Sequence, residues 1–245
     1  MNHRVLIALP VFNEAVYVNE VLDQVSRYSD QIVVIDDGSV DGTSELLAAR
    51  GDVEIVTHPE NQGYGAALIS AFEFAIERRA DFVITIDCDG QHEPQRIPEF
   101  VASCKNADIV SGSRYLKSFI DDNPPPAQRK HINHLITAEL NEQLSLHITD
   151  AFCGFKAYRV ASLKRLQLTE PGYAMPLELW VQAAAAGLRI AELPVPLIYL
   201  DEKRTFGGRL DEADVRLEYY RLVLERSLAA LGDHQQVAFA ERPCD

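Results

Sequence analysis

Short apolar runs alternate with more polar stretches over the first ninety residues of the chain. The apolar runs are rich in β-branched residues, which is typical of strands buried on both faces of a parallel sheet. The pattern predicts strands at Val5–Leu9, Ile32–Ile35, Val53–Val56 and Phe82–Ile86, with helices at Ala15–Tyr28, Thr43–Arg50 and Tyr64–Arg79 between them. Such alternation indicates right-handed βαβ units and therefore an α/β fold, with a mainly parallel central sheet flanked by helices.

The second half of the chain is less regular. The segment Asp121–Pro126 ends in three prolines, which cannot continue a helix, so it predicts an exposed loop. Helices are expected at His131–His147, Met175–Ala186 and Glu212–Leu231. We expect one domain over residues 1–232, with halves at 1–115 and 116–232, and a flexible tail at 233–245.

Composition narrows the class of protein. The chain has 245 residues, of which 47% are hydrophobic, enough for one well-buried domain. No signal peptide and no apolar run long enough to cross a bilayer is apparent, and the four cysteines lack metal-ligand spacing. A net charge of −14 argues against nucleic-acid binding and against broad adhesion to an anionic membrane. These features predict a soluble, cytoplasmic protein with reduced thiols.

Polar clusters follow each of the four predicted strands. In a parallel sheet the carboxyl ends of the strands share one edge, which is where α/β proteins bind ligands. Each cluster alone could be an ordinary turn or loop, but four on one edge predict a binding site. The clusters are Pro10–Glu14, Asp36–Ser39, His58–Gly65 and Asp87–Gln91.

The sequence Asp87-Cys88-Asp89-Gly90-Gln91 offers two carboxylates that alternate along an extended backbone. Carboxylate oxygens are hard ligands that suit Mg²⁺ or Mn²⁺. With Glu14, Asp36 and Asp37 nearby, the edge would carry five carboxylates, and one such pair ~4 Å apart repels by about 4 kcal/mol at an effective dielectric near 20. A nucleotide with a divalent metal would supply both a cation and hydrogen-bond donors. Arg114 and Arg204 are candidate partners for its phosphates, and neither a P-loop nor a dinucleotide-binding glycine motif is present.

The ordered motifs resemble those of glycosyltransferase family 2, in particular its dolichyl-phosphate mannose synthase and polyprenyl-phosphate glycosyltransferase branch. The matching segments are Pro10–Glu14, Asp36–Ser39, Asn61–Ala67, Asp87–His92 and Ser113–Tyr115. The resemblance extends over roughly residues 4–225. It implies a GT-A fold and an inverting transfer from a nucleoside-diphosphate sugar that depends on Mg²⁺ or Mn²⁺.

The resemblance also implies roles for individual residues. Residues 1–115 would bind the nucleotide sugar, and 116–232 would form the acceptor side. Metal ligands would be Asp89 and Gln91, with Asp87 contacting metal or sugar, and Asp87, Arg114 and Asp150 would be catalytic. The donor would contact Pro10, Phe12, Glu14, Asp36, Asp37, Gly65 and Asp87. The glycines Gly63 and Gly65 would let the backbone pass close to the ligand, unless they are plain loop glycines.

On the acceptor side, the segment that contains Asp150 is similar to a segment found in this branch of the family. If the acceptor is a hydroxyl, Asp150 would be the general base. If the acceptor is an ionised phosphate, Asp150 would orient or bind it. The structural alternative to both roles is that Asp150 caps a local turn. Contacts to an acceptor phosphate are expected from Arg129, Lys130, Lys156 and Arg204. The loop after Arg204 departs from the branch's Arg-x-x-Gly-x-Ser-Lys pattern, because Arg209 and Leu210 occupy the Ser-Lys positions.

The leading hypothesis is a metal-dependent inverting transferase that moves a hexose from a GDP-mannose or UDP-glucose type donor to polyprenyl phosphate. Two alternatives stay open: the same donor chemistry onto a soluble hydroxyl acceptor with Asp150 as base, and a non-catalytic nucleotide-sugar-binding protein. A lipid acceptor would bring the chain to the membrane surface, and the segment Tyr199–Tyr220 is the candidate for this peripheral contact. The sequence leaves the oligomeric state open.

Overall fold

The computed structural model describes residues 3–120, 122–123, 125–200 and 206–240, the last nine of these by their backbone alone. Within these ranges, seven strands form one sheet in the order β3-β2-β1-β4-β6-β5-β7. All strands run in the same direction except β6, which is antiparallel to both of its neighbours. The strands are β1 (Val5–Val11), β2 (Ile32–Asp36), β3 (Glu54–Thr57), β4 (Phe82–Thr85), β5 (Ile109–Ser113), β6 (Lys156–Arg159) and β7 (Ile190–Pro194).

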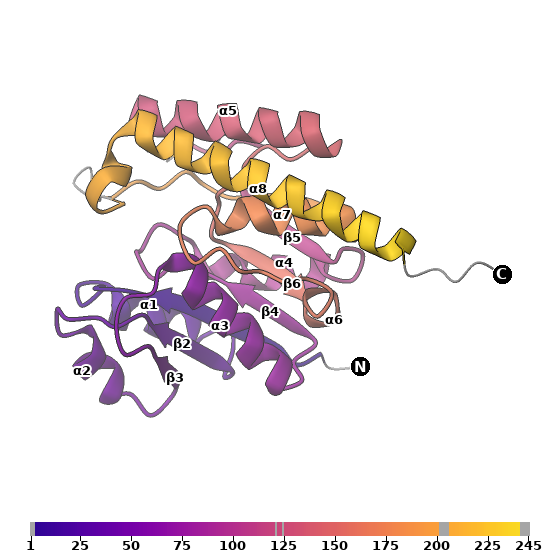
Figure 1. Cartoon of the computed structure of the whole chain (residues 1–245). Helices are drawn as coiled ribbons and strands as arrows, with labels where there is room; N and C mark the ends of the chain where they lie inside the picture. The colour runs from indigo at the N-terminus through magenta and orange to yellow at the C-terminus, as the bar shows by residue number, and fades with distance from the viewer. Residues whose placement is uncertain (1–2, 121, 124, 201–205, 241–245) are drawn as a thin grey trace.

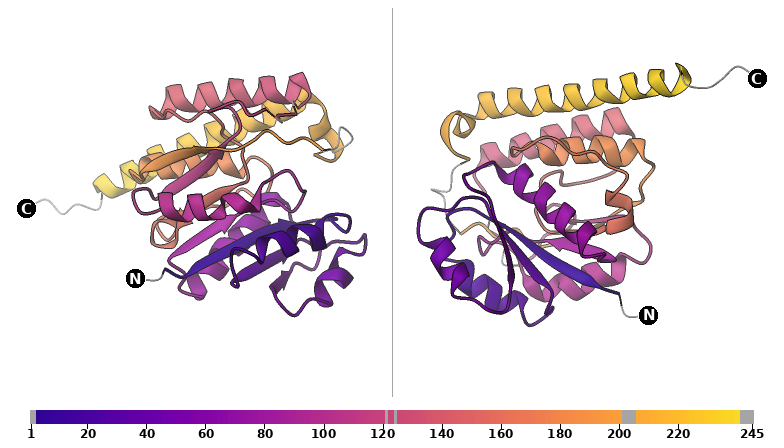
Figure 2. Two further views of the ribbon diagram at one scale, coloured as in Figure 1. Left: turned by 180° about the vertical axis from the view of Figure 1, so that it is seen from behind. Right: turned by 60° about the horizontal axis from the view of Figure 1, so that its bottom comes forward.

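Helices cover both faces of the sheet (Figure 1). One face carries α1 (Val18–Val25), α2 (Thr43–Ala48) and, after the 3₁₀ turn η1 (Pro94–Arg96), α4 (Ile97–Ser103). The other carries α3 (Tyr64–Glu77), α6 (Val160–Leu163) and α7 (Met175–Ala185). On this second side, α5 (Ala127–Leu144) and α8 (Ala213–Ala240) pack against α7 and form an outer layer, with the 3₁₀ turn η2 (Gly208–Asp211) just before α8 (Figure 2).

The alternation of side chains along β1 explains why the sheet is buried on both sides. Leu6 and Ala8 point into the core beneath α3, whereas Ile7 and Leu9 point into the core beneath α1, and all four are buried. A strand with two buried faces needs an apolar residue at nearly every position, as its sequence shows. The core on the α3 side also holds Trp180, whose indole Nε1 donates to the carbonyl oxygen of Ala151 at 2.9 Å.

The structure confirms the predicted α/β architecture. The four predicted strands and all six predicted helices are present, with ends shifted by a few residues at most positions. The last helix is an exception, since it continues to Ala240 and so covers residues 233–240, which the sequence assigned to a flexible tail. Residues 241–245 lie outside the described residues, as do Asp121 and Pro124 of the predicted loop. No helix in the described ranges is both long and apolar enough to span a bilayer.

Candidate active site

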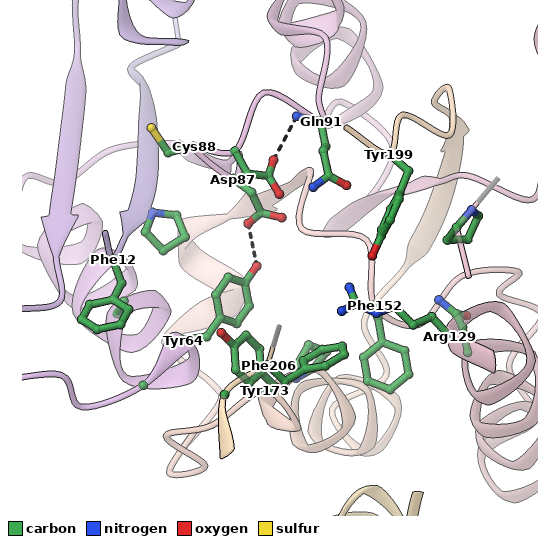
Figure 3. A pocket seen from close by; sticks show the side chains of 18 of the residues that line it. Phe12, Tyr64, Asp87, Cys88, Gln91, Arg129, Phe152, Tyr173, Tyr199 and Phe206 are labelled. Atoms are coloured by element: carbon green, nitrogen blue, oxygen red, sulfur yellow. Dashed lines mark hydrogen bonds between the residues drawn. The ribbon is translucent and has the colours of Figure 1, made fainter. Parts of the chain in front are cut away.

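A cavity of about 790 Å³ opens at the carboxyl ends of β1, β2 and β4. Because these strands are parallel, the four predicted polar clusters lie close together there. Each cluster contributes residues that line the cavity or that hold a lining residue in place. Figure 3 shows Phe12 and Asp87 on one side of the cavity and Arg129, Phe152 and Tyr199 on the other. The first half of the chain contributes Pro10, Phe12, Glu14, Asp37, Asp87, Asp89, Gln91 and Arg114, and the second half contributes Arg129, Tyr173, Tyr199, Phe206 and Arg216, among others.

Asp87 is held in place from both of its oxygens. The Tyr64 hydroxyl donates to Oδ1 at 2.9 Å, and Nε2 of His92 lies 3.2 Å from Oδ2. Burial acts to raise the pKa of Asp87, but the contacts with His92 and Tyr64 outweigh it, so that the pKa is lowered. Tyr64 itself stacks on Tyr173, with ring centroids 5.8 Å apart. Asp87 is therefore a fixed, ionised carboxylate.

Asp89 lies in a different electrostatic environment. Burial and the negative charge of Asp87 raise the pKa of Asp89, and its Oδ1 accepts a hydrogen bond from the Gln91 backbone N–H at 3.0 Å. A cation beside the two carboxylates would relieve this repulsion, and Mg²⁺ commonly binds through one or two carboxylates together with substrate phosphates. Among the residues that the structure describes, no three His, Cys, Asp or Glu side chains form a ready metal cage. The side chains of Asp87, Asp89 and Gln91 therefore fit the predicted divalent metal.

Asp37 lines the cavity and receives three contacts. Its Oδ1 lies 2.6 Å from Nδ1 of His58 and accepts the Gln62 backbone N–H at 2.9 Å, while Oδ2 accepts the Gly63 N–H at 2.8 Å. The other ring nitrogen of His58 lies 2.9 Å from the Ser70 hydroxyl. His58 thus fixes the orientation of Asp37. The sequence placed His58 in a strand-end cluster but gave it no role.

Two predicted donor contacts have other roles. Asp36 does not line the cavity; it accepts the Ser39 N–H at 3.1 Å and the Ser44 hydroxyl at 2.5 Å, and so shapes the turn before α2. Gly65 allows close packing, because a Cβ there would lie 2.3 Å from the carbonyl oxygen of Glu170. Gly63 has a φ of 109° and approaches Pro171 in the same way, although it also borders the cavity. Gly65 therefore has a packing role, and its contact with the donor stays a prediction.

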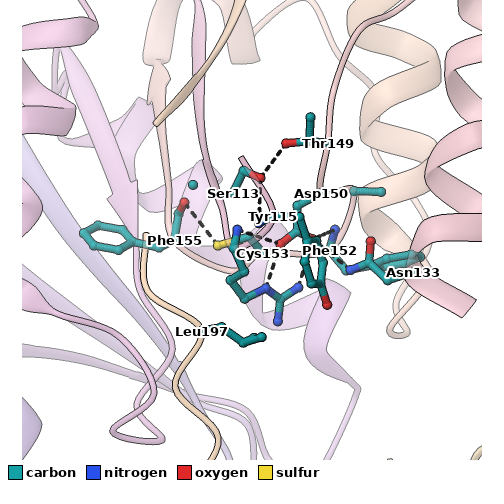
Figure 4. Close-up of polar contacts among 12 residues, drawn as sticks. Ser113, Tyr115, Asn133, Thr149, Asp150, Phe152, Cys153, Phe155 and Leu197 are labelled. Carbon is teal, nitrogen blue, oxygen red and sulfur yellow. Dashed lines mark hydrogen bonds and ion pairs between the residues drawn. The ribbon is translucent and has the colours of Figure 1, made fainter. Parts of the chain in front are cut away.

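Arg114, which lines the cavity, forms a two-point ion pair with Asp150. Figure 4 shows Asp150 beside its hydrogen-bond partner Asn133. Nε of Arg114 lies 2.7 Å from Oδ2, and Nη2 lies 2.9 Å from Oδ1. Asp150 is fully buried and also accepts from the Asn133 side chain at 2.8 Å and the Phe152 N–H at 3.1 Å. Burial would raise the pKa of Asp150, but Arg114 and Asn133 hold it well below its usual range.

This environment argues against Asp150 as a general base. A carboxylate with a lowered pKa and with both oxygens already accepting hydrogen bonds is poorly suited to take a proton. Asp150 is also not part of the cavity surface, whereas Arg114 is. Burial acts to lower the pKa of Arg114, but the charge of Asp150 outweighs it and the pKa is raised. Asp150 therefore positions a permanently charged guanidinium.

The residues predicted to contact an acceptor phosphate lie in different places in the structure. Arg129 lines the cavity, but Lys130 is exposed outside it. Lys156 is buried in β6, where its Nζ donates to the Cys153 carbonyl oxygen and lies 5.6 Å from the Trp180 ring, so it does not reach the cavity. Arg204 lies outside the described residues. Arg216 of α8 lines the cavity and was not predicted, because nothing in the helix pattern distinguishes it from the other arginines of α8.

Glu178 of α7 has a structural role. Its Oε2 accepts the backbone N–H groups of Thr169 and Glu170, both at 2.8 Å, which fixes the turn that leads to Tyr173.

Comparison with known proteins identifies the family. The sequence profile of glycosyl transferase family 2 matches residues 6–167. The undecaprenyl-phosphate mannosyltransferase of Micrococcus luteus is 29% identical over 232 residues, which cover 89% of this chain and 94% of the relative. The polyprenol monophosphomannose synthase of Mycolicibacterium smegmatis is 28% identical over 203 residues, which cover 78% of this chain and 76% of the relative.

A solved structure confirms the fold independently. The crystal structure of glucosyl-3-phosphoglycerate synthase from Mycobacterium tuberculosis superposes with a TM-score of 0.72 at 21% identity, covering 93% of this chain and 81% of the other. Its central sheet and flanking helices are those of the GT-A fold. The chain therefore belongs to glycosyl transferase family 2, resembles the dolichyl-phosphate mannose synthase branch, and is a hexosyltransferase of the GT-A fold.

Proposed function

We propose that the protein transfers a hexose from a nucleoside-diphosphate sugar to polyprenyl phosphate with inversion at the anomeric carbon. We further propose that this reaction requires Mg²⁺ or Mn²⁺. The observation that carries this proposal is the division of the cavity into two chemically opposite surfaces. We define the acidic wall as Glu14, Asp37, Asp87 and Asp89. We define the basic-aromatic wall as Arg129, Tyr173, Tyr199, Phe206 and Arg216.

The acidic wall suits the donor. Asp37 can accept hydrogen bonds from base or ribose, and Asp87, Asp89 and Gln91 would hold the metal. When bound, the metal would neutralise the donor diphosphate and favour its departure. The M. tuberculosis glucosyl-3-phosphoglycerate synthase has been solved with Mn²⁺ and uridine diphosphate bound, which makes a metal and a uridine nucleotide reasonable first probes. Both GDP- and UDP-sugars remain candidates for this chain.

The other side of the cavity suits a phosphorylated lipid. Apolar side chains adjoin the basic-aromatic wall, where an isoprenoid chain could lie, and the relatives in M. luteus and M. smegmatis carry names that specify polyprenyl acceptors. These apolar residues are Ile132, Phe152, Leu197, Ile198 and Tyr220. A phosphate acceptor also agrees with the state of Asp150, because an ionised phosphate oxygen needs no general base.

In this mechanism an oxygen of the acceptor phosphate attacks the anomeric carbon of the hexose. The bond from that carbon to the donor diphosphate breaks, and the nucleoside diphosphate leaves with the electron pair. No proton has to be removed from the acceptor. Arg114, fixed by Asp150, places a positive charge at the cavity surface that stabilises the phosphates during the reaction. Approach from the side opposite to the leaving group inverts the anomeric centre.

The test uses labelled GDP-mannose and UDP-glucose with undecaprenyl phosphate in detergent, with Mn²⁺, with Mg²⁺ and with a chelator. We expect label in the lipid fraction with one donor and one or both metals, and none with the chelator. A set of soluble hydroxyl acceptors runs in parallel. Label on a soluble hydroxyl compound and none on the lipid would refute the proposed acceptor.

A further inference from the structure

One turn of the chain contacts two carboxylates of the acidic wall. Asp37 follows β2 and Asp87 follows β4, and these two strands lie on either side of β1. The backbone N–H of Gly63 donates to Oδ2 of Asp37 at 2.8 Å. The hydroxyl of the next residue, Tyr64, is directed at Asp87 (Figure 3) and donates to its Oδ1 at 2.9 Å. Gly63 and Tyr64 therefore connect the two strand ends that carry the acidic wall.

The Tyr64 ring is itself held in place. Tyr64 is the first residue of α3, and its ring stacks on that of Tyr173, with centroids 5.8 Å apart and planes 14° from parallel. The turn that carries Tyr173 is hydrogen-bonded to the same end of α3, because the Ala66 N–H donates to the Pro171 carbonyl oxygen at 3.0 Å. A side chain that is fixed at both its ring and its backbone presents its hydroxyl in one direction. The contact with Asp87 is thus part of a rigid arrangement.

Asp87 has little freedom to turn away from Tyr64. Its carboxylate packs against Gly154, where a Cβ atom would collide with both carboxylate oxygens. Oδ2 also lies 3.2 Å from Nε2 of His92. A carboxylate offers about four lone-pair sites, so Asp87 can keep its contacts with Tyr64 and His92 and still bind a cation. The orientation in which Asp87 would meet that cation is set by the protein alone.

We propose that Tyr64 is a positioning residue that acts through Asp87, because its hydroxyl holds the carboxylate in the orientation that meets the divalent metal of the donor complex. Groups that hydrogen-bond to a metal-binding carboxylate orient it, and their loss commonly reduces the affinity for the metal. This inference rests on the proposed function for the metal. It goes further by giving the segment Asn61–Ala67 a part in metal binding through its tyrosine rather than through its glycines.

The test compares two hydroxyl deletions, Tyr64→Phe and Tyr173→Phe, in the full-length protein. Both tyrosines belong to the same stacked pair and line the cavity, but of the two only Tyr64 donates to Asp87. The affinity for Mn²⁺ is measured by electron paramagnetic resonance of the free ion, with saturating UDP and, separately, with GDP. We expect Tyr64→Phe to weaken Mn²⁺ binding about tenfold and Tyr173→Phe to leave it unchanged.

Binding of UDP and GDP without metal separates positioning from direct contact, and ligand-observed NMR measures it. If Tyr64 acts through Asp87, Tyr64→Phe keeps the wild-type affinity for the metal-free nucleotide. A loss of that affinity equal to the loss of Mn²⁺ affinity would show that the hydroxyl binds the nucleotide itself, and would overturn the positioning role.

Tyr173→Leu is the second variant, because it keeps the Tyr64 hydroxyl and removes the ring on which Tyr64 stacks. We expect it to weaken Mn²⁺ binding about threefold, and it decides the question if thermal unfolding shows that Tyr64→Phe does not fold. Wild-type Mn²⁺ affinity in a folded Tyr64→Phe would overturn the role of Tyr64. So would equal losses in Tyr64→Phe and Tyr173→Phe.

The outcomes separate this inference from the proposed reaction. If the wild type binds Mn²⁺ with UDP or GDP in a way that depends on Tyr64 but transfers no sugar to polyprenyl phosphate, the role of Tyr64 stands and the proposed acceptor fails. If the wild type binds no Mn²⁺ with either nucleotide yet transfers sugar to the lipid, the transfer reaction stands and the role of Tyr64 is overturned.

Discussion

The Arg114 guanidinium and the Asp150 carboxylate meet in a two-point ion pair, with N–O distances of 2.7 and 2.9 Å, in which the carboxylate is buried and the guanidinium faces the cavity. Removing one partner of a buried pair leaves the other charge uncompensated. We predict that Asp150→Asn destabilises the protein by about 3–5 kcal/mol and reduces transfer, because Arg114 loses its fixed position. Urea unfolding and initial transfer rates measure the two effects.

Asp108→Asn is the control for this prediction. Asp108 pairs with Arg159 and Arg189 and does not line the cavity, so its loss should affect stability and leave the affinity for donor and acceptor unchanged. A general base at Asp150 would behave differently, since Asp150→Asn would then abolish transfer even in the fraction of the protein that stays folded. That pattern would contradict the positioning role.

The same pair predicts how stability depends on pH. Because the pKa of Asp150 is lowered in the folded protein, its stabilising contribution is present above the unfolded pKa of about 4 and is lost as pH falls through the lower folded value. The free energy of unfolding should therefore decrease more steeply in the wild type than in Asp150→Asn between about pH 5 and pH 2. Urea titrations at several pH values measure both slopes, and equal slopes would rule the contribution out.

His58 supports Asp37 and should affect the donor alone. Its Nδ1 lies 2.6 Å from Asp37 Oδ1, so removal of the ring leaves this carboxylate of the acidic wall with only its two backbone contacts. We predict that His58→Asn weakens nucleoside-diphosphate binding by about tenfold, or about 1.4 kcal/mol, with little change in the acceptor KM. His147→Asn is the matched control, because His147 is exposed and not part of the cavity. Equal donor affinity in both variants would show that His58 has no such role.

The buried cysteines should be inert in the folded protein. Burial raises the pKa of Cys88 to about 12 and the pKa values of Cys104 and Cys153 to about 11. The reactive thiolate is therefore scarce at about pH 8. We predict that iodoacetamide leaves these three residues unmodified in the native state and modifies them in urea, as peptide mass spectrometry would show. Rapid modification of native Cys88 would contradict its packing in the core.

The acidic wall could be predicted from the sequence because it depends on strand direction alone. Parallel strands bring their carboxyl ends to one edge, so Glu14, Asp37 and Asp89 had to lie near one another once the strands were recognised. What the pattern could not decide was which member of a pair faces the cavity. Asp36 ends β2 and turns toward Ser44, whereas Asp37 enters the cavity, as expected for neighbours that point to opposite sides.

The basic-aromatic wall depends on tertiary packing and was largely missed. Lys156 occupies a four-residue strand with charged residues at both ends, so the apolar pattern that revealed the other strands is absent there. The antiparallel insertion of β6 between β4 and β5 buries it away from the cavity. Arg216 is brought to the site by α8 packing on α7, and its spacing along the helix resembles that of arginines that face solvent.

The most direct test of the account is a competition between two acceptors in one reaction. The wild-type protein, the preferred nucleotide sugar and Mn²⁺ or Mg²⁺ are incubated with equal amounts of citronellyl phosphate and citronellol, and the products are resolved by NMR. We predict sugar on the phosphate oxygen alone, with the anomeric configuration opposite to that of the donor. Sugar on the hydroxyl of citronellol, or a product that retains the donor configuration, would contradict the account.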